Sequence, residues 1–369
     1  MRLDSVEVIR CHLPLVRPFR TSFGTEYEKD VLLLKVTTAD GVVGWGECAA
    51  DRAPLYSHEF NDAAIIVLRD HLVPRLMRAG ELTAEDVPGL LRPVRGHPMA
   101  RAALEMAVLD AQLRTAGVSL GSYLGSTRDR IDCGVSVGIP DDDELATLMA
   151  EVEGYVDAGY RRIKLKIQPG WDIVPTTKVR ERWPDIPLQV DANQAYGRDA
   201  IEHLAQLDAL DLLLIEQPLH EDDLRGHQLL AERMVTAVCL DESVISVATA
   251  DSAIEYGACE IVNIKAGRVS GYLEAKAIHD MCLGRGIPVW CGGMVETGLG
   301  RAANIALASL PGFVLPGDTS ASDRFFTRDV TEPFVLRDGQ IAVPTGPGLG
   351  VEPIPDVLDD ITVWRSPLT

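Results

Sequence analysis

The sequence predicts an α/β fold, in which a (β/α)8-type barrel is combined with a smaller α+β unit. From about residue 131, eight short β-rich runs alternate with amphipathic stretches, which is the pattern of parallel strands joined by helices. The runs are 132–139, 161–167, 187–193, 212–219, 237–243, 260–267, 288–294 and 313–320. Eight such units in succession are typical of a closed barrel.

The segment before the barrel predicts the second unit. Residues 5–15 and 30–50 have the composition of strands, with Asp40-Gly41 as a hairpin turn between the two halves of the second segment. Residues 61–80 and 99–117 follow with the periodicity of helices. Strands followed by helices indicate an α+β arrangement.

The segment after the barrel, residues 331–357, is rich in proline and glycine and has a second Asp-Gly turn at Asp338-Gly339. Because it follows the last predicted strand, it must pack outside the barrel, and we expect it to complete the N-terminal unit as a capping domain. The expected boundaries are 1–128 for the N-terminal part of the cap, 129–321 for the barrel and 322–369 for the returning segment.

Composition excludes several classes of function. The formal net charge of −20 over 369 residues argues against binding to the nucleic-acid backbone, and no apolar run approaches membrane-spanning length. The seven cysteines include no CxxC pair, and no signal peptide is recognisable, so we expect a reduced, cytoplasmic protein. The eight histidines include no HExxH, which makes carboxylates the better metal candidates.

Charged residues recur near the C-terminal ends of successive runs. They are Lys166, Asp191, Glu216, Asp241 and Lys265, each 24 or 25 residues from the next. One charged group therefore arrives with each βα unit. Because active sites of such barrels are built at the C-terminal strand ends, the spacing predicts five charged side chains around one mouth.

The three carboxylates come from neighbouring strands of the predicted barrel. Asp191, Glu216 and Asp241 would repel one another unless a cation lay between them, and hard oxygen ligands of this kind suit Mg²⁺. Other divalent cations such as Mn²⁺ have the same ligand preference. The alternative is that each is a solvated loop carboxylate paired with an arginine.

The two lysines lie four strands apart and would face each other across the mouth. A substrate carboxylate held at the metal would place its α-carbon between Lys166 and Lys265, so one lysine could remove a proton and the other return it from the opposite face. Lys164, on the same strand face as Lys166, would disfavour the charged form of its neighbour. The alternative for this lysine pair is an edge strand protected against aggregation. Asn193 and Asn263 have the parity to form hydrogen bonds inside the mouth.

These residues resemble the enolase superfamily, in the subgroup with a KxK motif on the second barrel strand; the combination of a lysine base with Mg²⁺ is a known pattern of such sites. More narrowly, they resemble the o-succinylbenzoate synthase and N-acylamino acid (N-succinylamino acid) racemase family over nearly the whole chain. The motifs are PLVRPFRTSFGT, RIKLKIQPGWD, QVDAN, LLLIEQPL, CLDES, VNIKAGRVSGYLEA, VWCGGMVETGLGRAAN and LPGDTSASDRF. One small departure is Ala266, where relatives commonly have proline.

The resemblance implies a modified TIM barrel of (β/α)7β type and a homo-oligomer. It implies Lys166 and Lys265 as the catalytic acid/base pair and Asp191, Glu216 and Asp241 as the Mg²⁺ ligands. It further implies cap loops that close over the mouth, around residues 19–23 and 50–56. The implied substrate contacts are Phe19, Ser136, Lys164, Asn193, Gly293 and Met294.

Two activities remain open within this family. One is racemisation of N-acyl or N-succinyl amino acids with both lysines. The other is a syn-dehydration to o-succinylbenzoate, as in a dedicated synthase of menaquinone biosynthesis, with Lys166 as base and Lys265 as a stabilising cation. Dipeptide epimerases carry a DxD motif on the eighth strand, whereas this sequence has Ser320 at the second position, which favours an N-acylated small-molecule carboxylate as substrate.

Three other interpretations are weaker. The run Gly134–Gly138 matches GxSxG of hydrolases, but β-branched valines on either side hold Ser136 within a strand. The run Gly298–Ala303 matches a dinucleotide fingerprint, but it follows the seventh barrel strand rather than opening a first one. We therefore expect its glycines to open a helix that shapes the pocket or holds a substrate carboxylate. A non-catalytic protein would not need both lysines and all three carboxylates.

Overall fold

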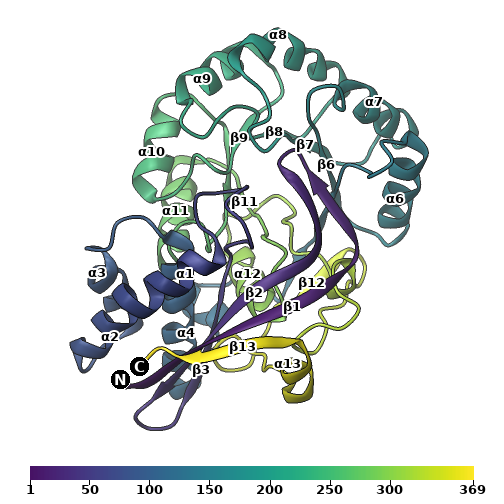
Figure 1. The fold of residues 1–369 in the computed structure, drawn as a ribbon. Coiled ribbons are helices and arrows are strands. Elements are labelled where there is room, and N and C mark those ends of the chain that lie inside the picture. Colours follow the sequence, from purple (N-terminus) through teal and green to yellow (C-terminus); the bar gives the residue numbers. More distant parts are fainter.

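The computed structural model describes residues 1–369 and contains two units that share one continuous hydrophobic core (Figure 1). A curled, seven-stranded parallel sheet with strand order β11-β10-β9-β8-β7-β6-β5 forms the barrel. A four-stranded antiparallel sheet with order β13-β1-β2-β3 forms the cap. No helix combines the length and the apolar composition needed to cross a membrane.

The barrel strands are short and wholly buried, and helices follow them in turn. The strands are β5 (Gly134–Val137), β6 (Arg162–Lys166), β7 (Leu188–Asp191), β8 (Ile215–Glu216), β9 (Val238–Leu240), β10 (Ile261–Ile264) and β11 (Val289–Cys291). The helices are α6 (Leu145–Asp157), α7 (Ile173–Arg182), α8 (Ile201–Leu204), α9 (Leu224–Arg233), α10 (Val247–Glu255), α11 (Tyr272–Arg285) and α12 (Gly298–Ala308). The predicted βα alternation is confirmed for seven of the eight runs.

The eighth predicted run, residues 313–320, closes the barrel without forming a regular strand. The backbone N–H of Asp318 donates to Cys291 at the end of β11 (2.8 Å), and Gly134 of β5 donates to Gly317 (2.8 Å). Pro316 lies between Phe313 and Gly317, which form isolated bridges to Val289 and Cys133, and proline has no N–H to give to a ladder. The ring is therefore closed by single contacts rather than by an eighth strand of the sheet.

The cap consists of the antiparallel sheet and a group of helices. Its strands are β1 (Leu3–Thr21), β2 (Gly24–Thr38), β3 (Val43–Cys48) and β13 (Thr362–Pro367). Its helices are α1 (Asn61–Val67), α2 (Val73–Ala79), α3 (Val87–Leu91), α4 (Pro98–Ala116), α5 (Leu120–Leu124) and α13 (Pro355–Ile361). A small ladder between β4 (Arg130–Asp132) and β12 (Gln340–Ala342) joins the C-terminal segment to the start of the barrel.

Helix α4 packs directly on β3 because two glycines of the strand leave room for it. A Cβ atom on Gly44 would lie 2.1 Å from the backbone oxygen of Ala107, and one on Gly46 would lie 2.0 Å from that of Ala103. Any larger residue would separate the strand from the helix. This close approach fixes the position of α4 under the sheet.

The long β1–β2 hairpin extends from the cap to the barrel mouth (Figure 1). Near its tip, the hydroxyl of Ser22 donates to the backbone oxygen of Ala192 (3.0 Å), and Ile139 donates its N–H to Arg20 (2.9 Å). Both barrel residues follow the C-terminal ends of parallel strands. The hairpin tip therefore covers the edge where the predicted site residues lie.

Two buried carboxylates of the cap bind the N-termini of barrel helices. Glu47 of β3 accepts the N–H groups of Thr297 (2.8 Å) and Gly300 (2.9 Å) at α12. Glu105 of α4 accepts those of Tyr272 and Leu273 at α11 (both 2.9 Å). Burial raises the pKa of each carboxyl to about 7. The backbone N–H groups at a helix start have no partner within the helix, and here a side chain from the other unit accepts their hydrogen bonds.

The contact of Glu47 also decides how the glycine-rich run 298–303 functions. These residues open α12, as expected, and Thr297 caps the helix. The helix start binds the carboxylate of Glu47, so the expectation that it holds a substrate carboxylate is wrong. Sequence alone could not give this result, because Glu47 lies in the other unit.

Candidate active site

The five charged residues predicted from spacing converge at the mouth of the barrel. Each lies at the last residue of a parallel strand or directly after it, and each is almost fully buried. Along the sheet, Lys166 is paired in register with Asp191, and Asp191 with Glu216. The five are Lys166 (β6), Asp191 (β7), Glu216 (β8), Asp241 (after β9) and Lys265 (after β10).

Lys166 and Lys265 are held in different surroundings. The ammonium group of Lys166 donates to Asp191 Oδ2 and to Asn193 Oδ1, both at 2.6 Å. The Nζ atom of Lys265 lies 2.8 Å from Asp241 Oδ2. Burial alone would lower the pKa of Lys265, but Asp241, Tyr56 and Glu242 together outweigh this effect and raise the pKa well above its usual value. Each lysine thus has a carboxylate of its own.

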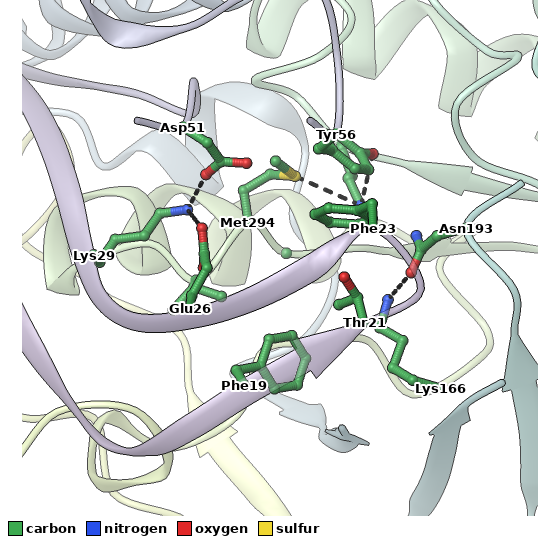
Figure 2. Close-up of a pocket in the computed structure, with 13 residues that line it drawn as sticks. Phe19, Thr21, Phe23, Glu26, Lys29, Asp51, Tyr56, Lys166, Asn193 and Met294 are labelled. Carbon is green, nitrogen blue, oxygen red and sulfur yellow. Dashed lines mark hydrogen bonds and ion pairs between the residues drawn. The ribbon is translucent and has the colours of Figure 1, made fainter. Parts of the chain in front are cut away.

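Both lysines line one cavity between the cap and the barrel (Figure 2). Phe19 and Thr21 come from β1, and Lys29 of β2 points toward Glu26 and Asp51, with which it is ion-paired. The lining from the cap is completed by aromatic side chains, and the lining from the barrel comes from strand ends. The full set is Phe19, Thr21, Phe23, Glu26, Lys29, Asp51, Tyr56, Lys166, Asn193, Lys265, Gly293, Met294 and Val295.

Of the six predicted substrate contacts, four line this cavity: Phe19, Asn193, Gly293 and Met294. Lys164 and Ser136 do not. Ser136 lies within β5, as expected, and its buried hydroxyl has no hydrogen-bond partner. The roles of all six in binding stay predictions.

Lys164 lies beneath the cavity among three carboxylates. Its Nζ is 2.7 Å from Asp318, 3.0 Å from Glu216 and 3.1 Å from Asp191, and 4.9 Å from the centre of the Trp290 ring. Burial alone would lower the pKa of Lys164, but these carboxylates, Asp318 above all, raise it. These carboxylates therefore favour the protonated form of Lys164.

The carboxylates crowd one another. Burial, together with the charge of Asp191, raises the pKa of Glu216 to about 8, although Lys164 opposes this. Burial would also raise the pKa of Asp191, but Lys166 and Lys164 lower it below its ordinary value. Negative charges that raise one another's pKa in a buried site are stabilised by a bound cation.

No group of three His, Cys, Asp or Glu side chains is arranged around a single point as a metal site in this structure. The donor set of Asp191, Glu216 and Asp241 nevertheless fits Mg²⁺ chemically, because all three are buried anionic oxygen donors on adjacent strands. The ammonium groups of Lys164, Lys166 and Lys265 lie among them. A divalent cation would therefore take over charge balance that the lysines now provide.

Several contacts in the site were not predicted from the sequence. Tyr56 accepts a hydrogen bond from Lys265 (3.0 Å) and donates one to Asp241 (3.1 Å). Arg268 donates to Asp241 Oδ1 (2.7 Å), and Asp318 binds Lys164. Asp318 could have been found, since it follows the same strand-end pattern in the eighth run. Tyr56 ends the cap loop 50–56 that the resemblance placed over the mouth, but no spacing within the barrel points to its contact with Lys265.

The backbone at the strand ends is held in an unusual conformation. Asn193 (φ 41°), Gln217 (φ 36°) and Val295 (φ 59°) adopt left-handed conformations that L-residues rarely take. Asp191 Oδ1 accepts the N–H of Asn193 (3.0 Å) and supports it there. Strain of this kind concentrates at functional sites, where it orients side chains.

Comparison with known proteins agrees with this geometry. The mandelate racemase/muconate lactonizing enzyme N-terminal domain model matches residues 5–125, and the enolase C-terminal domain-like model matches residues 147–357. An N-succinylamino acid racemase of an Amycolatopsis species is 58% identical over 368 residues, 99% of each chain. An o-succinylbenzoate synthase of Geobacillus kaustophilus is 46% identical over 95% of this chain and 94% of its own. The crystal structure of an enolase superfamily member from Listeria innocua superposes with a TM-score of 0.95 at 39% identity, covering 100% of both chains.

Proposed function

Because this chain belongs to the enolase superfamily, in the family of N-succinylamino acid racemases and o-succinylbenzoate synthases, we propose that it removes a proton from a carbon next to a carboxylate. The reaction we assign is racemisation of N-acyl and N-succinyl amino acids, with o-succinylbenzoate synthase activity at the same site. One observation carries the proposal: Lys166 and Lys265, four strands apart in the sheet, line the same cavity.

In the proposed mechanism the substrate α-carbon lies between the two Nζ atoms. Lys166 acts on one face and Lys265 on the other, so that one removes the proton and its partner delivers a proton to the opposite side. Asn193 positions Lys166, and Tyr56 with Asp241 positions Lys265. The cap residues around Phe19 and Phe23 exclude water from the cavity.

Members of this superfamily depend on Mg²⁺ in general, and we propose Asp191, Glu216 and Asp241 as its ligands in this chain, with Mn²⁺ as a substitute. Bound there, the ion supplies positive charge that stabilises the enediolate of the substrate. Lys164, which binds Asp191 and Glu216 through its ammonium group, fixes the orientation of two of these ligands.

The dehydration to o-succinylbenzoate is supported by the surroundings of Lys265. Its Nζ lies 4.9 Å from the centre of the Tyr56 ring and is paired with Asp241, both of which favour the protonated amine. In the dehydration, a protonated Lys265 suits the role of a cation beside the enediolate. The alternative to a dual activity is a dedicated synthase of menaquinone biosynthesis.

An N-acylated substrate is supported by the region after the barrel. Ser320 is buried, and its backbone oxygen accepts a hydrogen bond from Arg301. A free substrate ammonium would meet no second carboxylate at this position. We propose that the acyl group lies in the part of the cavity lined by the cap.

The test is proton exchange at the α-carbon. Purified protein with Mg²⁺ is incubated in D₂O with each enantiomer of an N-succinyl amino acid, and loss of the α-proton is followed by NMR. We expect exchange from both enantiomers. Lys166→Ala and Lys265→Ala should each abolish exchange from a different enantiomer. If the unaltered protein exchanges neither enantiomer, the racemase proposal fails, and o-succinylbenzoate formation is then measured to separate the two activities.

Further proposals concern the whole chain. We propose a cytoplasmic homo-oligomer that acts on a small-molecule carboxylate, and the seven buried free cysteines support a reducing compartment. We propose domain boundaries at 1–128, 129–321 and 322–369, supported by the pairing of β13 with β1. Light scattering of the purified protein measures the oligomeric state, and a mass equal to one chain would contradict the proposed homo-oligomer.

A further inference from the structure

Glu242 is a buried carboxylate with one side-chain hydrogen bond. It is 2% exposed and is the second residue after β9, next to Asp241. Its Oε1 accepts a hydrogen bond from the side-chain amide of Asn193 (3.0 Å), and its Oε2 has no partner. A buried carboxylate held this loosely is costly, which calls for a function that an apolar residue could not supply.

The single contact has a directional effect. The side-chain amide of Asn193 turns its NH₂ group, which can only donate, toward Glu242 Oε1. The amide oxygen is thereby turned the other way, where it accepts from Lys166 Nζ at 2.6 Å. In the neutral amine form, Lys166 would give an N–H to this oxygen, and its lone pair would point away from Asn193 toward the cavity.

Consecutive residues at the end of β9 therefore serve opposite faces of the cavity. Asp241 contacts Lys265 (2.8 Å), whereas Glu242 reaches Lys166 through Asn193. We propose that Glu242 is a positioning residue for Lys166: by fixing the orientation of the Asn193 amide, it aims the lone pair of Lys166 at one face of the substrate. This proposal deepens the function proposed above and rests on it.

The test compares the two faces in one enzyme. Glu242→Asp keeps the charge but withdraws the carboxylate by one methylene group from Asn193. We expect α-proton exchange by Lys166 to fall about 10- to 100-fold, the effect of a displacement of about 1 Å, while exchange by Lys265 changes less than about threefold. The face served by each lysine is assigned with the single-lysine variants. Glu221→Asp is the matched control, because the hydrogen bonds of Glu221 come from its backbone.

A double-variant experiment separates positioning from a general structural effect. If Glu242 acts through Asn193, Glu242→Asp should cause no further loss on the Lys166 face in an Asn193→Ala background. Equal losses on both faces, or independent losses in the double variant, would overturn the proposal. Mg²⁺ affinity is measured for each variant, and a loss of affinity equal to the loss of rate would also overturn it.

A crystal structure of the Glu242→Asp variant tests the same idea without any activity. We expect the contact of Lys166 Nζ with Asn193 Oδ1 to lengthen beyond hydrogen-bond distance or to be replaced by the flipped amide. An unchanged contact would refute the proposal even if the enzyme exchanged protons as expected. Failure of the unaltered protein to exchange any proton would refute the proposed function instead, and this structure would still decide the role of Glu242.

Discussion

Stability of this protein should depend on the neutral form of His227, a fully buried residue of α9. Its Nδ1–H donates to the backbone oxygen of Asp223 (2.9 Å), and its Nε2 accepts the N–H of Leu219 (3.2 Å). Protonation of Nε2 would place its N–H against the backbone N–H of Leu219, so that two donors would face each other. Leu219 lies three residues after Glu216, so this ring supports the loop that leaves the active site.

The magnitude follows from the pKa. Burial lowers the pKa of His227 from 6.5 to about 4, so in the folded protein the ring stays neutral while the unfolded chain takes up a proton. The contribution of His227 is fully present above pH 6.5 and is lost as the pH falls from 6.5 to about 4. At 1.36 kcal/mol per pKa unit, the loss is about 3 kcal/mol at most.

The assay is urea unfolding of the unaltered protein and of His227→Gln between about pH 7.5 and pH 4.5. The difference in unfolding free energy between the two proteins should shrink by about 2.5 kcal/mol over this pH range, because glutamine does not titrate and the contributions of other groups cancel. His220→Gln is the control, since the His220 side chain is 66% exposed. A difference that stays constant with pH would refute the assignment.

Three further predictions concern packing, the cap and the metal. Gly46→Ala should lower stability by about 3 kcal/mol or more, because its Cβ would lie 2.0 Å from a backbone oxygen of α4, whereas Gly154→Ala, which meets no atom within 4 Å, should gain up to about 1 kcal/mol; similar melting temperatures would contradict this. Lys29→Met should raise KM for the N-succinyl substrate about tenfold more than Arg52→Met, because it removes the cation paired with Asp51, which lines the cavity, and steady-state kinetics that show equal KM values would refute it. Dialysis against a chelator should abolish α-proton exchange and Mg²⁺ should restore it while raising the melting temperature; exchange that persists in chelator would exclude the metal role.

The placement of the five charged residues could be predicted because it depends on a regular repeat. In a parallel barrel every βα unit returns the chain to the same edge, so a spacing of 24 or 25 residues is enough to bring Lys166 and Lys265 to one mouth. The surroundings of each lysine could not be predicted in this way. Tyr56 reaches Lys265 only because the cap folds over the barrel.

The two predictions that failed, the eighth strand and the substrate contact at the start of α12, have a common physical origin. The eighth run has the composition of a strand. It would have to pair with β11 on one side and β5 on the other, but Pro316 lacks an N–H, and only single bridges form. The start of α12 has glycines that suit an anion, and the anion is Glu47 from a distant part of the chain. Local sequence shows that a donor needs a partner, whereas the identity of the partner depends on tertiary packing.

The pairing of β1 with β13 has a consequence for the order of folding. Glu7 is paired with Pro367, so the sheet that carries the hairpin over the active site is completed by a strand that is very distant in sequence. Contacts between such distant residues form late, because a very long loop must be closed first. The barrel ring is closed by Gly134 and Gly317, which are much nearer to each other in sequence. The charged mouth of the barrel would therefore form before the sheet that covers it is complete.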